Sequence, residues 1–458
     1  MTAVSPLLLI VLPLAMAPFV YVLRRWATLS GLLAAAVSLL TARLCLSTPL
    51  DWSSRIWGGE MILEPLDRFF LAFAFALATV MFLYAWRISQ GWSLFSFGLV
   101  ILSLLSGALM IRSFLHSVLL VEIAAAIIVF LIQGGRRGST RAALRYLIMM
   151  VMATPPFLLT ARLLDLHVIA PDNLALVRLS VALLALGFGL LLGAVPFQAW
   201  LSTLGAEAPP MVTAFILSII NGVALLSMLD LLQRYPWLTM EAPVFRISTV
   251  TGLLTACTGG LLAFAQQDFG RLLAYAALSD MGCILVGLGT ASPLGLSAAL
   301  LLLFTRSVAV ALAAMGLGAI RYYATSDAFA RLGGVAGRMP IATLGLIGGG
   351  LSLAGFPLTG GFASRWLLYH ALSGGNGLLT VALVLAGGGV ALGYLRGLVA
   401  MLGRAEEERP PQKGWREPII VSALIVIMAF LCLAMGLYPQ LLLQLILRLI
   451  ETYTFVGS

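Results

Sequence analysis

The sequence predicts an all-α polytopic membrane protein with about fourteen transmembrane helices. Hydrophobic residues make up 61% of the 458 residues and charged residues only 10%, whereas roughly 25% of an average soluble protein is charged. Apolar runs long enough to cross a hydrocarbon core roughly 30 Å thick recur along nearly the whole chain. The short strands of alternating polarity that a transmembrane β-barrel requires do not occur in this pattern.

The apolar runs define the predicted spans in chain order. They lie approximately at residues 6–23, 27–46, 68–86, 92–111, 114–132, 143–163, 175–195, 211–233, 247–265, 272–289, 294–320, 341–371, 378–402 and 418–438. The first run lacks a small-residue cleavage site and a soluble continuation, so we expect a retained span there and not a signal peptide.

The basic residues predict how these spans are oriented. Lysine and arginine concentrate in the loops after odd-numbered spans, as at Arg136, Arg137 and Arg321. Cytoplasmic loops carry such an excess, so both termini should be non-cytoplasmic. The net charge of +9 is spread among loops and forms no single patch, so nucleic acid is not an expected partner. The polar stretch that contains Glu406 and Lys413 is interpreted as a solvated connector and not as a docking motif.

Two predicted spans contain residues that interrupt a straight helix. The twelfth carries Gly355, Pro357 and Gly360, so we expect two half-helices with unwound backbone between them. The eighth carries Ser218 and Asn221, where a milder break is expected. Paired discontinuous helices in two halves of a chain indicate inverted repeats.

Four segments carry a family resemblance. Residues 196–201 read PFQAWL and residues 207–209 read EAP; residues 263–282, 355–365 and 436–440 follow in the corresponding order. Together they resemble the antiporter-like membrane subunits of respiratory complex I and its relatives. Three positions depart from that pattern, because Gln198 stands where the family has histidine, and Ser202 with Thr203 replaces a Pro-Asp pair.

The resemblance implies a division of the chain. Residues 1–110 would hold the first three helices and the start of the fourth, and residues 92–233 the first inverted repeat of five helices. Residues 247–402 would form the second five-helix repeat. Residues 403–458 would hold a polar loop, the last span and a short amphipathic segment.

Glu122 is the leading candidate for a functional residue because it lies in the middle of an apolar span. Intramembrane acids are rare and usually mark ion pathways, and the resemblance aligns Glu122 with the family's fifth-span glutamate. A structural bridge to a neighbouring helix or subunit is the alternative reading. Arg306 and Arg365 are the arginines placed well inside spans. Arg365 corresponds to the family's twelfth-span relay lysine, but arginine does not deprotonate in proteins, so a fixed charge is expected.

The other family lysines are missing. Leu191 and a position at or beside Asn221 correspond to them, and Lys413 is the only lysine in the chain. Asp280 replaces a family histidine, and two readings stay open, a half-channel lining and a packing or capping group. The candidate ion-pathway residues are Glu122, Glu207, Asn221, Asp280, Arg306 and Arg365.

No catalytic, metal or cofactor site is expected in this chain. The four cysteines are far apart, and neither a C-x-x-C motif nor a phosphate-binding glycine loop occurs. The resemblance places quinone, flavin and iron–sulfur centres in partner subunits. It implies that other membrane-arm subunits and the lipid bilayer are the partners, in a prokaryotic-type inner (cell) membrane or another energy-transducing membrane.

Three functions are compatible with these observations. The first is a membrane-arm subunit of a redox-driven ion pump, with proton translocation coupled to quinone reduction through a reduced relay. The second is a non-pumping scaffold of such a complex, which the missing lysines favour. The third is a subunit of a multisubunit cation/proton antiporter. The length of the chain favours the shorter N-type subunit over the L-type, which has a long lateral helix.

Overall fold

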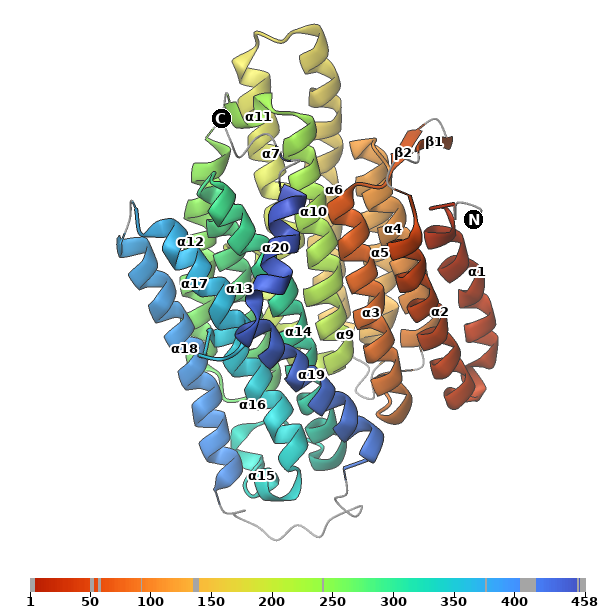
Figure 1. Ribbon diagram of the computed structural model, residues 1–458, viewed down its shortest axis with the longest axis vertical. Coiled ribbons are helices and arrows are strands. Elements are labelled where there is room, and N and C mark those ends of the chain that lie inside the picture. Colours follow the sequence, from red (N-terminus) through yellow and green to blue (C-terminus); the bar gives the residue numbers. More distant parts are fainter. Residues whose placement is uncertain are drawn as a thin grey trace. The chain divides into compact units, whose positions relative to one another are not determined.

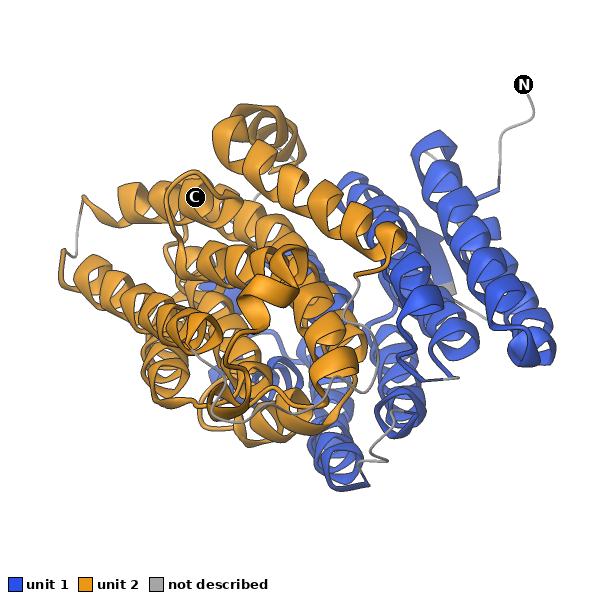
Figure 2. Cartoon of the chain, turned by 90° about the horizontal axis from the view of Figure 1, so that it is seen from below, with its two compact units in different colours: residues 1–192, 219–242 blue, residues 193–218, 243–458 orange. Residues whose placement is uncertain are grey.

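The computed structural model describes residues 5–49, 53–56, 59–91, 93–134, 140–240, 243–374, 377–403, 417–450 and 453. The basic pair Arg136 and Arg137 and the connector with Glu406 and Lys413 lie outside these residues. The chain forms two compact units, which are described separately (Figure 2). Unit 1 comprises residues 1–192 and 219–242, and unit 2 comprises residues 193–218 and 243–458.

Unit 1 is a helical bundle with one small hairpin (Figure 1). Its helices are α1 (Leu8–Val22), α2 (Ala27–Ser47), α3 (Pro65–Arg87), α4 (Leu94–Met110), α5 (Phe114–Gln133), α6 (Thr140–Ile169), α7 (Leu174–Leu192), α10 (Asn221–Arg234) and α11 (Trp237–Met240), with a 3₁₀ turn at Leu23–Arg25. Strands β1 (Ser53–Ile56) and β2 (Gly59–Ile62) pair antiparallel, with Ser53 opposite Ile62. Helix α2 packs along α3, and α6 packs along α7.

Helix α3 shows how unit 1 is assembled. Pro65 begins the helix at a position where its missing N–H costs no hydrogen bond. Along the helix, the Ser38 hydroxyl of α2 donates to the Phe75 carbonyl at 2.8 Å, which ties the two helices together inside an apolar interface. The ring of Phe70 lies directly against Gly222 of α10, where a side chain would clash. Glycine at this position therefore allows α3 and α10 to lie side by side.

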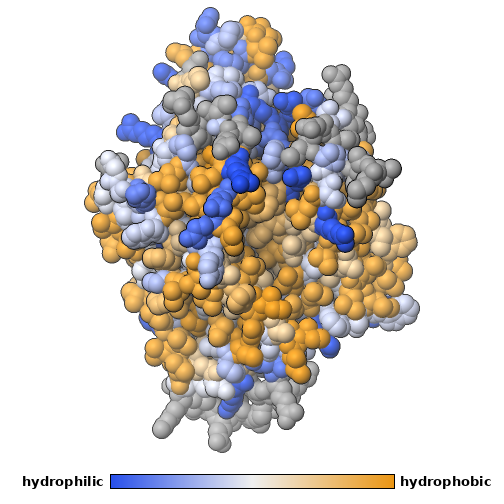
Figure 3. Space-filling model, viewed as in Figure 1, coloured by the Kyte–Doolittle hydropathy of each residue, from blue (hydrophilic) through white to orange (hydrophobic). Residues whose placement is uncertain are grey.

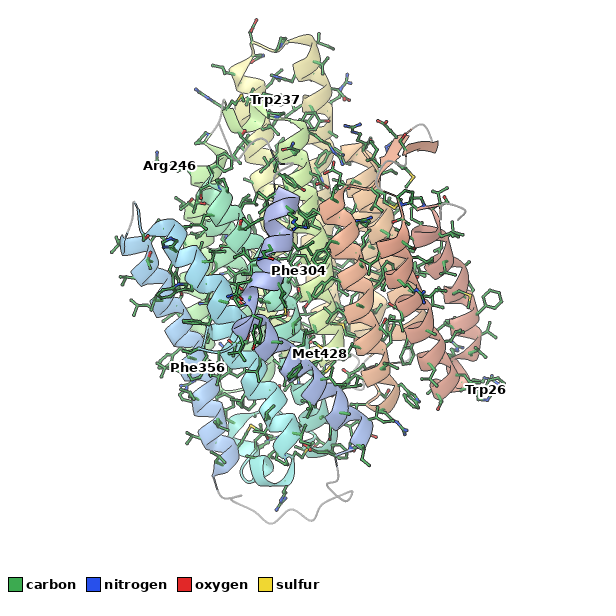
Figure 4. All side chains as sticks on the ribbon, in the orientation of Figure 1. Trp26, Trp237, Arg246, Phe304, Phe356 and Met428 are labelled. Carbon is green, nitrogen blue, oxygen red and sulfur yellow. The ribbon has the colours of Figure 1, made fainter. Side chains whose placement is uncertain are left out.

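Unit 2 contains the remaining helices. These are α8 (Ala199–Glu207), α9 (Pro210–Phe215), α12 (Val244–Ala265), α13 (Phe269–Gly289), α14 (Pro293–Ala324), α15 (Val335–Arg338), α16 (Pro340–Ala354), α17 (Gly360–Leu372), α18 (Gly377–Leu402), α19 (Ile419–Leu437) and α20 (Pro439–Ile450), with a 3₁₀ turn at Phe329–Arg331. The most apolar stretch of α14 is completely buried, and Phe304 near its middle lies among neighbouring side chains (Figure 4).

Helix α13 is fixed at its start and along its length. The Asp268 side chain caps it by accepting from the Arg271 backbone N–H at 2.9 Å. Burial raises the pKa of the Asp268 carboxyl above its ordinary value, although this capping bond opposes the change. Farther along, the Ser279 hydroxyl donates to the Ala256 carbonyl of α12 at 3.1 Å. Small residues at such interfaces allow close helix packing in membranes.

Twelve helices among the described residues are long and apolar enough to cross a membrane. The predicted span 92–111 is the 17-residue α4, and the predicted span 341–371 is divided into α16 and α17. The predicted count of fourteen is therefore not confirmed. Large hydrophobic side chains are exposed on many of these helices, including Ile419 at 86%, and hydrophobic residues cover much of the face in Figure 3. This surface suits an apolar solvent.

Both predicted helix breaks are present. Helix α16 ends at Ala354, and α17 begins at Gly360 after a loop in which Gly355 and Leu358 have φ angles of 79° and 71°. Between α9 and α10 the backbone forms a π-helical segment, Ile216–Ile220. Such segments occur mostly as single turns inside α-helices and often at functional sites. The assignment of two inverted repeats stays a prediction.

Candidate functional site

A buried ion pair lies at the break between α16 and α17 in unit 2. Nη2 of Arg365, on α17, lies 2.6 Å from Oδ1 of Asp280, on α13, and Nε lies 3.1 Å from the same oxygen. The two side chains are 2% and 1% exposed. The same Nη2 donates to the Leu353 carbonyl at 2.6 Å, near the end of α16. Arg365 therefore satisfies a helix-terminal carbonyl and neutralises the acid at once.

Two glycines make room for this guanidinium. A Cβ on Gly355 would lie 2.5 Å from Cδ of Arg365, and a Cβ on Gly387, on α18, would lie 2.5 Å from Nη1. Gly355 also has a left-handed backbone conformation, which glycine adopts most easily. The glycine-rich sequence that predicts the helix break thus also forms the space in which Arg365 is held.

Arg306 provides a second buried positive charge in unit 2. This side chain of α14 is 1% exposed. Its Nη1 donates to the Leu217 carbonyl in the π-helical segment at 2.5 Å, and its Nε donates to the Ala277 carbonyl of α13 at 3.3 Å. The charges of Arg306 and Arg365 both act on the Asp280 carboxylate. One buried acid is therefore held in the field of two buried cations.

Glu122 lies in a different environment, within unit 1. Its side chain, on α5, is half-buried, and it forms a hydrogen bond with Thr154 of α6. Oε1 of Glu122 has no hydrogen-bond partner among the described residues. A cavity of about 20 Å³ beside it is lined by Glu122, Phe157, Leu191 and Ser227, among others. This volume is sufficient for about one water molecule.

Leu191 is informative because it occupies the position of the family's seventh-span lysine. It lines the same cavity as Glu122, so the acid has an apolar neighbour where the resemblance predicts a cation.

Asn221 begins α10 and is 2% exposed, and Glu207 ends α8 and is half-buried. The structure thus brings together Asp280, Arg306 and Arg365 in unit 2. The functional roles of all six candidate residues stay predictions.

Sequence reasoning missed a polar cluster that holds the motif at residues 196–209 in place. Nη2 of Arg321 lies 2.5 Å from Oδ2 of Asp327, and Arg321 also donates to the carbonyls of Gly205 and Ala208 at 2.8 and 3.1 Å. The only signal in the sequence was a basic residue in a loop, which the positive-inside rule already explains. A second missed group, around Asp67 and Asp230, is described below.

Comparison with known proteins agrees with this fold. Residues 112–389 match the family described as NADH:quinone oxidoreductase/Mrp antiporter, TM. The chain is 33% identical to NADH-quinone oxidoreductase subunit N 2 of Acidobacterium capsulatum over 335 residues, which cover 67% of this chain and 66% of that protein. It is 26% identical to NADH-quinone oxidoreductase subunit N of Desulforudis audaxviator over 457 residues, or 90% of each chain.

A solved structure extends the agreement to nearly the whole fold. A chain of the membrane-bound sulfane sulfur reductase, an archaeal respiratory membrane complex, superposes with a TM-score of 0.85 over 99% of this chain and 98% of its own, at 20% identity. At this identity the likeness shows the fold alone. The chain belongs to the NADH:quinone oxidoreductase/Mrp antiporter transmembrane family.

Proposed function

We propose that this chain is an antiporter-like membrane-arm subunit of a complex I-type redox-driven ion pump. Its partners are other membrane-arm subunits and the lipid bilayer, and it contributes proton translocation coupled to quinone reduction elsewhere in the assembly. The quinone, flavin and iron–sulfur chemistry belongs to partner subunits. Family membership and relatives that carry the name NADH-quinone oxidoreductase subunit N support this proposal.

The observation that carries the proposal is the Asp280–Arg365 ion pair at a broken helix. Ionisable residues at membrane depth are costly and mark ion pathways. Irregular backbone at this depth is tolerated where it is buried in protein or lines a cavity. The pair combines both features, with side chains 1% and 2% exposed beside the gap between α16 and α17.

The two members of the pair differ in whether they can exchange a proton. Arg365 keeps its proton under all physiological conditions, so it serves as a fixed positive charge. Proton exchange therefore falls to Asp280 and, in unit 1, to Glu122 with water in its cavity. If movement of α17 separated the pair, the carboxylate would lose its counter-charge and a proton would then neutralise it. This is a reduced path, without the lysines of the family.

A scaffold without pumping is the second candidate function. It is favoured by Leu191, which cannot titrate and yet lines the cavity of Glu122. It is also favoured by Arg365 itself, since its Nη2 is engaged both with Asp280 and with the Leu353 carbonyl. In this alternative the buried charges hold the fold together and move no proton. A subunit of a multisubunit cation/proton antiporter is the third candidate, because the family description includes Mrp antiporters.

The test is the number of ions moved per electron pair by the intact complex in vesicles. The paired variant Asp280→Asn with Arg365→Gln removes both charges and keeps similar shapes. The pump proposal expects normal assembly and a lower ratio, whereas the scaffold predicts an unchanged ratio. Arg448→Gln on α20 is a charge-removal control at an exposed site. Co-purification in mild detergent identifies the third candidate, since a stand-alone antiporter would bring no redox subunits.

The proposed location is a prokaryotic-type inner (cell) membrane or another energy-transducing membrane, with both termini non-cytoplasmic. The distribution of basic residues supports this orientation. Single cysteines introduced as Ala3→Cys and Arg137→Cys into a cysteine-free variant provide the test. We expect labelling from outside at position 3 and from the cytoplasm at position 137, and the reverse pattern would invert the topology.

A further inference from the structure

Three carboxylates meet in unit 1, and none of them is among the candidate ion-pathway residues. Glu64 immediately precedes α3, Asp67 lies in the first turn of α3, and Asp230 lies one turn before the end of α10. One oxygen of each lies within 4.8 Å of those of the other two. Because Phe70 packs on Gly222, α3 and α10 are neighbours and this juxtaposition is part of their packing.

Asp67 is the member of the cluster that needs a ligand. Its side chain is completely buried, and neither carboxylate oxygen has a hydrogen-bond partner among the described residues. An acid in the first turn often caps a helix or balances its dipole, but Asp67 accepts from no backbone N–H there. A buried carboxylate without hydrogen bonds is strongly unfavourable unless another group compensates it.

Among the described basic residues, Arg68 and Arg112 bind groups outside the cluster. Nη1 of Arg68 donates to the Thr48 carbonyl at 3.0 Å, and Nη1 of Arg112 pairs with Glu60 at 3.1 Å. Arg234 acts electrostatically on Asp67, but its Nη1 donates to the Arg112 carbonyl. Asp67 therefore makes no ion pair among the described residues.

The geometry points to a divalent cation of the calcium class, and we propose that Glu64, Asp67 and Asp230 bind it. The donors are all carboxylate oxygens, which suit hard cations, and no histidine or cysteine belongs to the cluster. Calcium binds oxygens at 2.3–2.6 Å in flexible geometry and so accommodates three carboxylate oxygens that lie within 4.8 Å of one another, whereas magnesium demands near-ideal octahedral geometry and keeps several waters. Glu64 is half-buried, and it provides the entry side, with water completing the coordination shell.

The ion would fasten the start of α3 to the end of α10. Under the predicted orientation both helix ends are non-cytoplasmic, where calcium is more abundant than inside a cell. The proposed role is structural and independent of the ion pathway. It would therefore hold for a pump and for a scaffold alike.

The experiment uses the full chain in detergent or the whole complex. Equilibrium binding of radioactive calcium and the thermal unfolding midpoint are measured in chelator and in increasing calcium chloride, with magnesium chloride at equal ionic strength for comparison. We expect saturable binding of one calcium per chain and a rise in the midpoint that magnesium does not reproduce. Asp67→Asn should abolish both effects, and Asp172→Asn, an exposed acid of unit 1, should keep them.

A second variant keeps the test decisive if Asp67→Asn does not fold. Glu64→Gln removes the half-buried ligand only, and we expect at least a tenfold weaker calcium affinity with an unchanged midpoint in chelator. Two results would overturn the proposal. One is that the wild-type protein binds no calcium and that the Asp67→Asn variant is more stable than the wild type in chelator. That result would indicate acids that share protons and bind no metal ion. The other is an equal response to magnesium and calcium, which indicates nonspecific screening of the carboxylates.

Discussion

The acids of the two units that were singled out from the sequence are buried in opposite ways. Asp280 in unit 2 shares a 2.6 Å ion pair with Arg365 and lies in the field of Arg306. Glu122 in unit 1 has a hydroxyl partner and an apolar cavity lined by Leu191, and no ion pair of Glu122 occurs among the described residues. The comparison shows that two acids singled out by the same family pattern lie in opposite electrostatic environments, one beside a counter-charge and one beside an apolar side chain.

The largest expected effect comes from removing the counter-charge in unit 2. Arg365→Ala leaves Asp280 buried without its partner, and breaking a buried pair on one side costs about 3–5 kcal/mol. We expect little assembled complex and a strongly lowered unfolding midpoint of the purified chain in detergent. Arg365→Lys keeps the charge and should preserve assembly. The paired neutral variant, Asp280→Asn with Arg365→Gln, should recover most of the loss, and failure to recover would mean that charge is not the reason for the pairing.

The next largest effect is expected from a methyl group added beside the Arg365 side chain. Gly355→Ala places a methyl group 2.5 Å from Cδ of Arg365 at a φ of 79°, and we expect a loss of about 1–3 kcal/mol. Gly348→Ala is the matched control, because nothing lies within 4 Å of its added methyl group. That control should be neutral or stabilising by about 0.5–1 kcal/mol, since alanine favours a helix over glycine. Equal losses in both variants would contradict a tight fit around Arg365.

A third variant introduces a lysine in unit 1 at the position that corresponds to the family's seventh-span lysine. Leu191→Lys puts an amine beside Glu122, and we expect an interaction of about 0.5–3 kcal/mol between the two side chains. It is measured by a double-mutant cycle with Glu122→Gln on the unfolding midpoint. Leu191→Met, which keeps an apolar side chain of similar volume, is the control. A coupling energy near zero would show that the two side chains do not meet in the cavity.

The smallest expected effect on stability belongs to Glu122→Gln. Gln keeps the shape and a hydrogen-bonding group, and no described residue forms an ion pair with Glu122 that could be broken, so we expect a change of less than about 1 kcal/mol. The informative measurement is the ion-to-electron ratio of the complex in vesicles, which should fall if Glu122 exchanges protons. If assembly and transport are both unchanged, the residue is a structural remnant and the contrast between the units loses its functional meaning.

Much of the helical architecture follows from composition and from a few interrupting residues. Long apolar runs predict the spans, and Gly355 with Pro357 predicts the division of α16 from α17, because both signals act locally along the chain. The Asp280–Arg365 pair could not be predicted from the residues alone, since it joins α13 and α17 across 85 positions. From the sequence Asp280 has two open readings, a half-channel lining and a packing or capping group, and its contacts add a buried ion pair with Arg365 that neither reading includes.

The Asp67 cluster was missed for a related reason. Asp67 immediately precedes the predicted span 68–86 and Asp230 lies near the end of the predicted span 211–233, where single acids are usually solvated and need no explanation. Nothing in the sequence states that the two helix ends coincide in space. The β1–β2 hairpin at residues 53–62 was likewise hidden, because eight paired residues between two long apolar runs read as a polar loop.

Helix α14 differs from α19 in what its side chains touch. The most apolar stretch of α14 is completely buried, whereas only 22% of that of α19 is buried. For α14 the surrounding medium is other protein, so its evolution should be limited by side-chain volume more than by polarity. For α19 side-chain volume is less restricted, because most of its apolar stretch is not buried. Substitutions that change size but not hydrophobicity should therefore accumulate on α19 and be rare along α14, even though both helices are hydrophobic enough to cross a membrane.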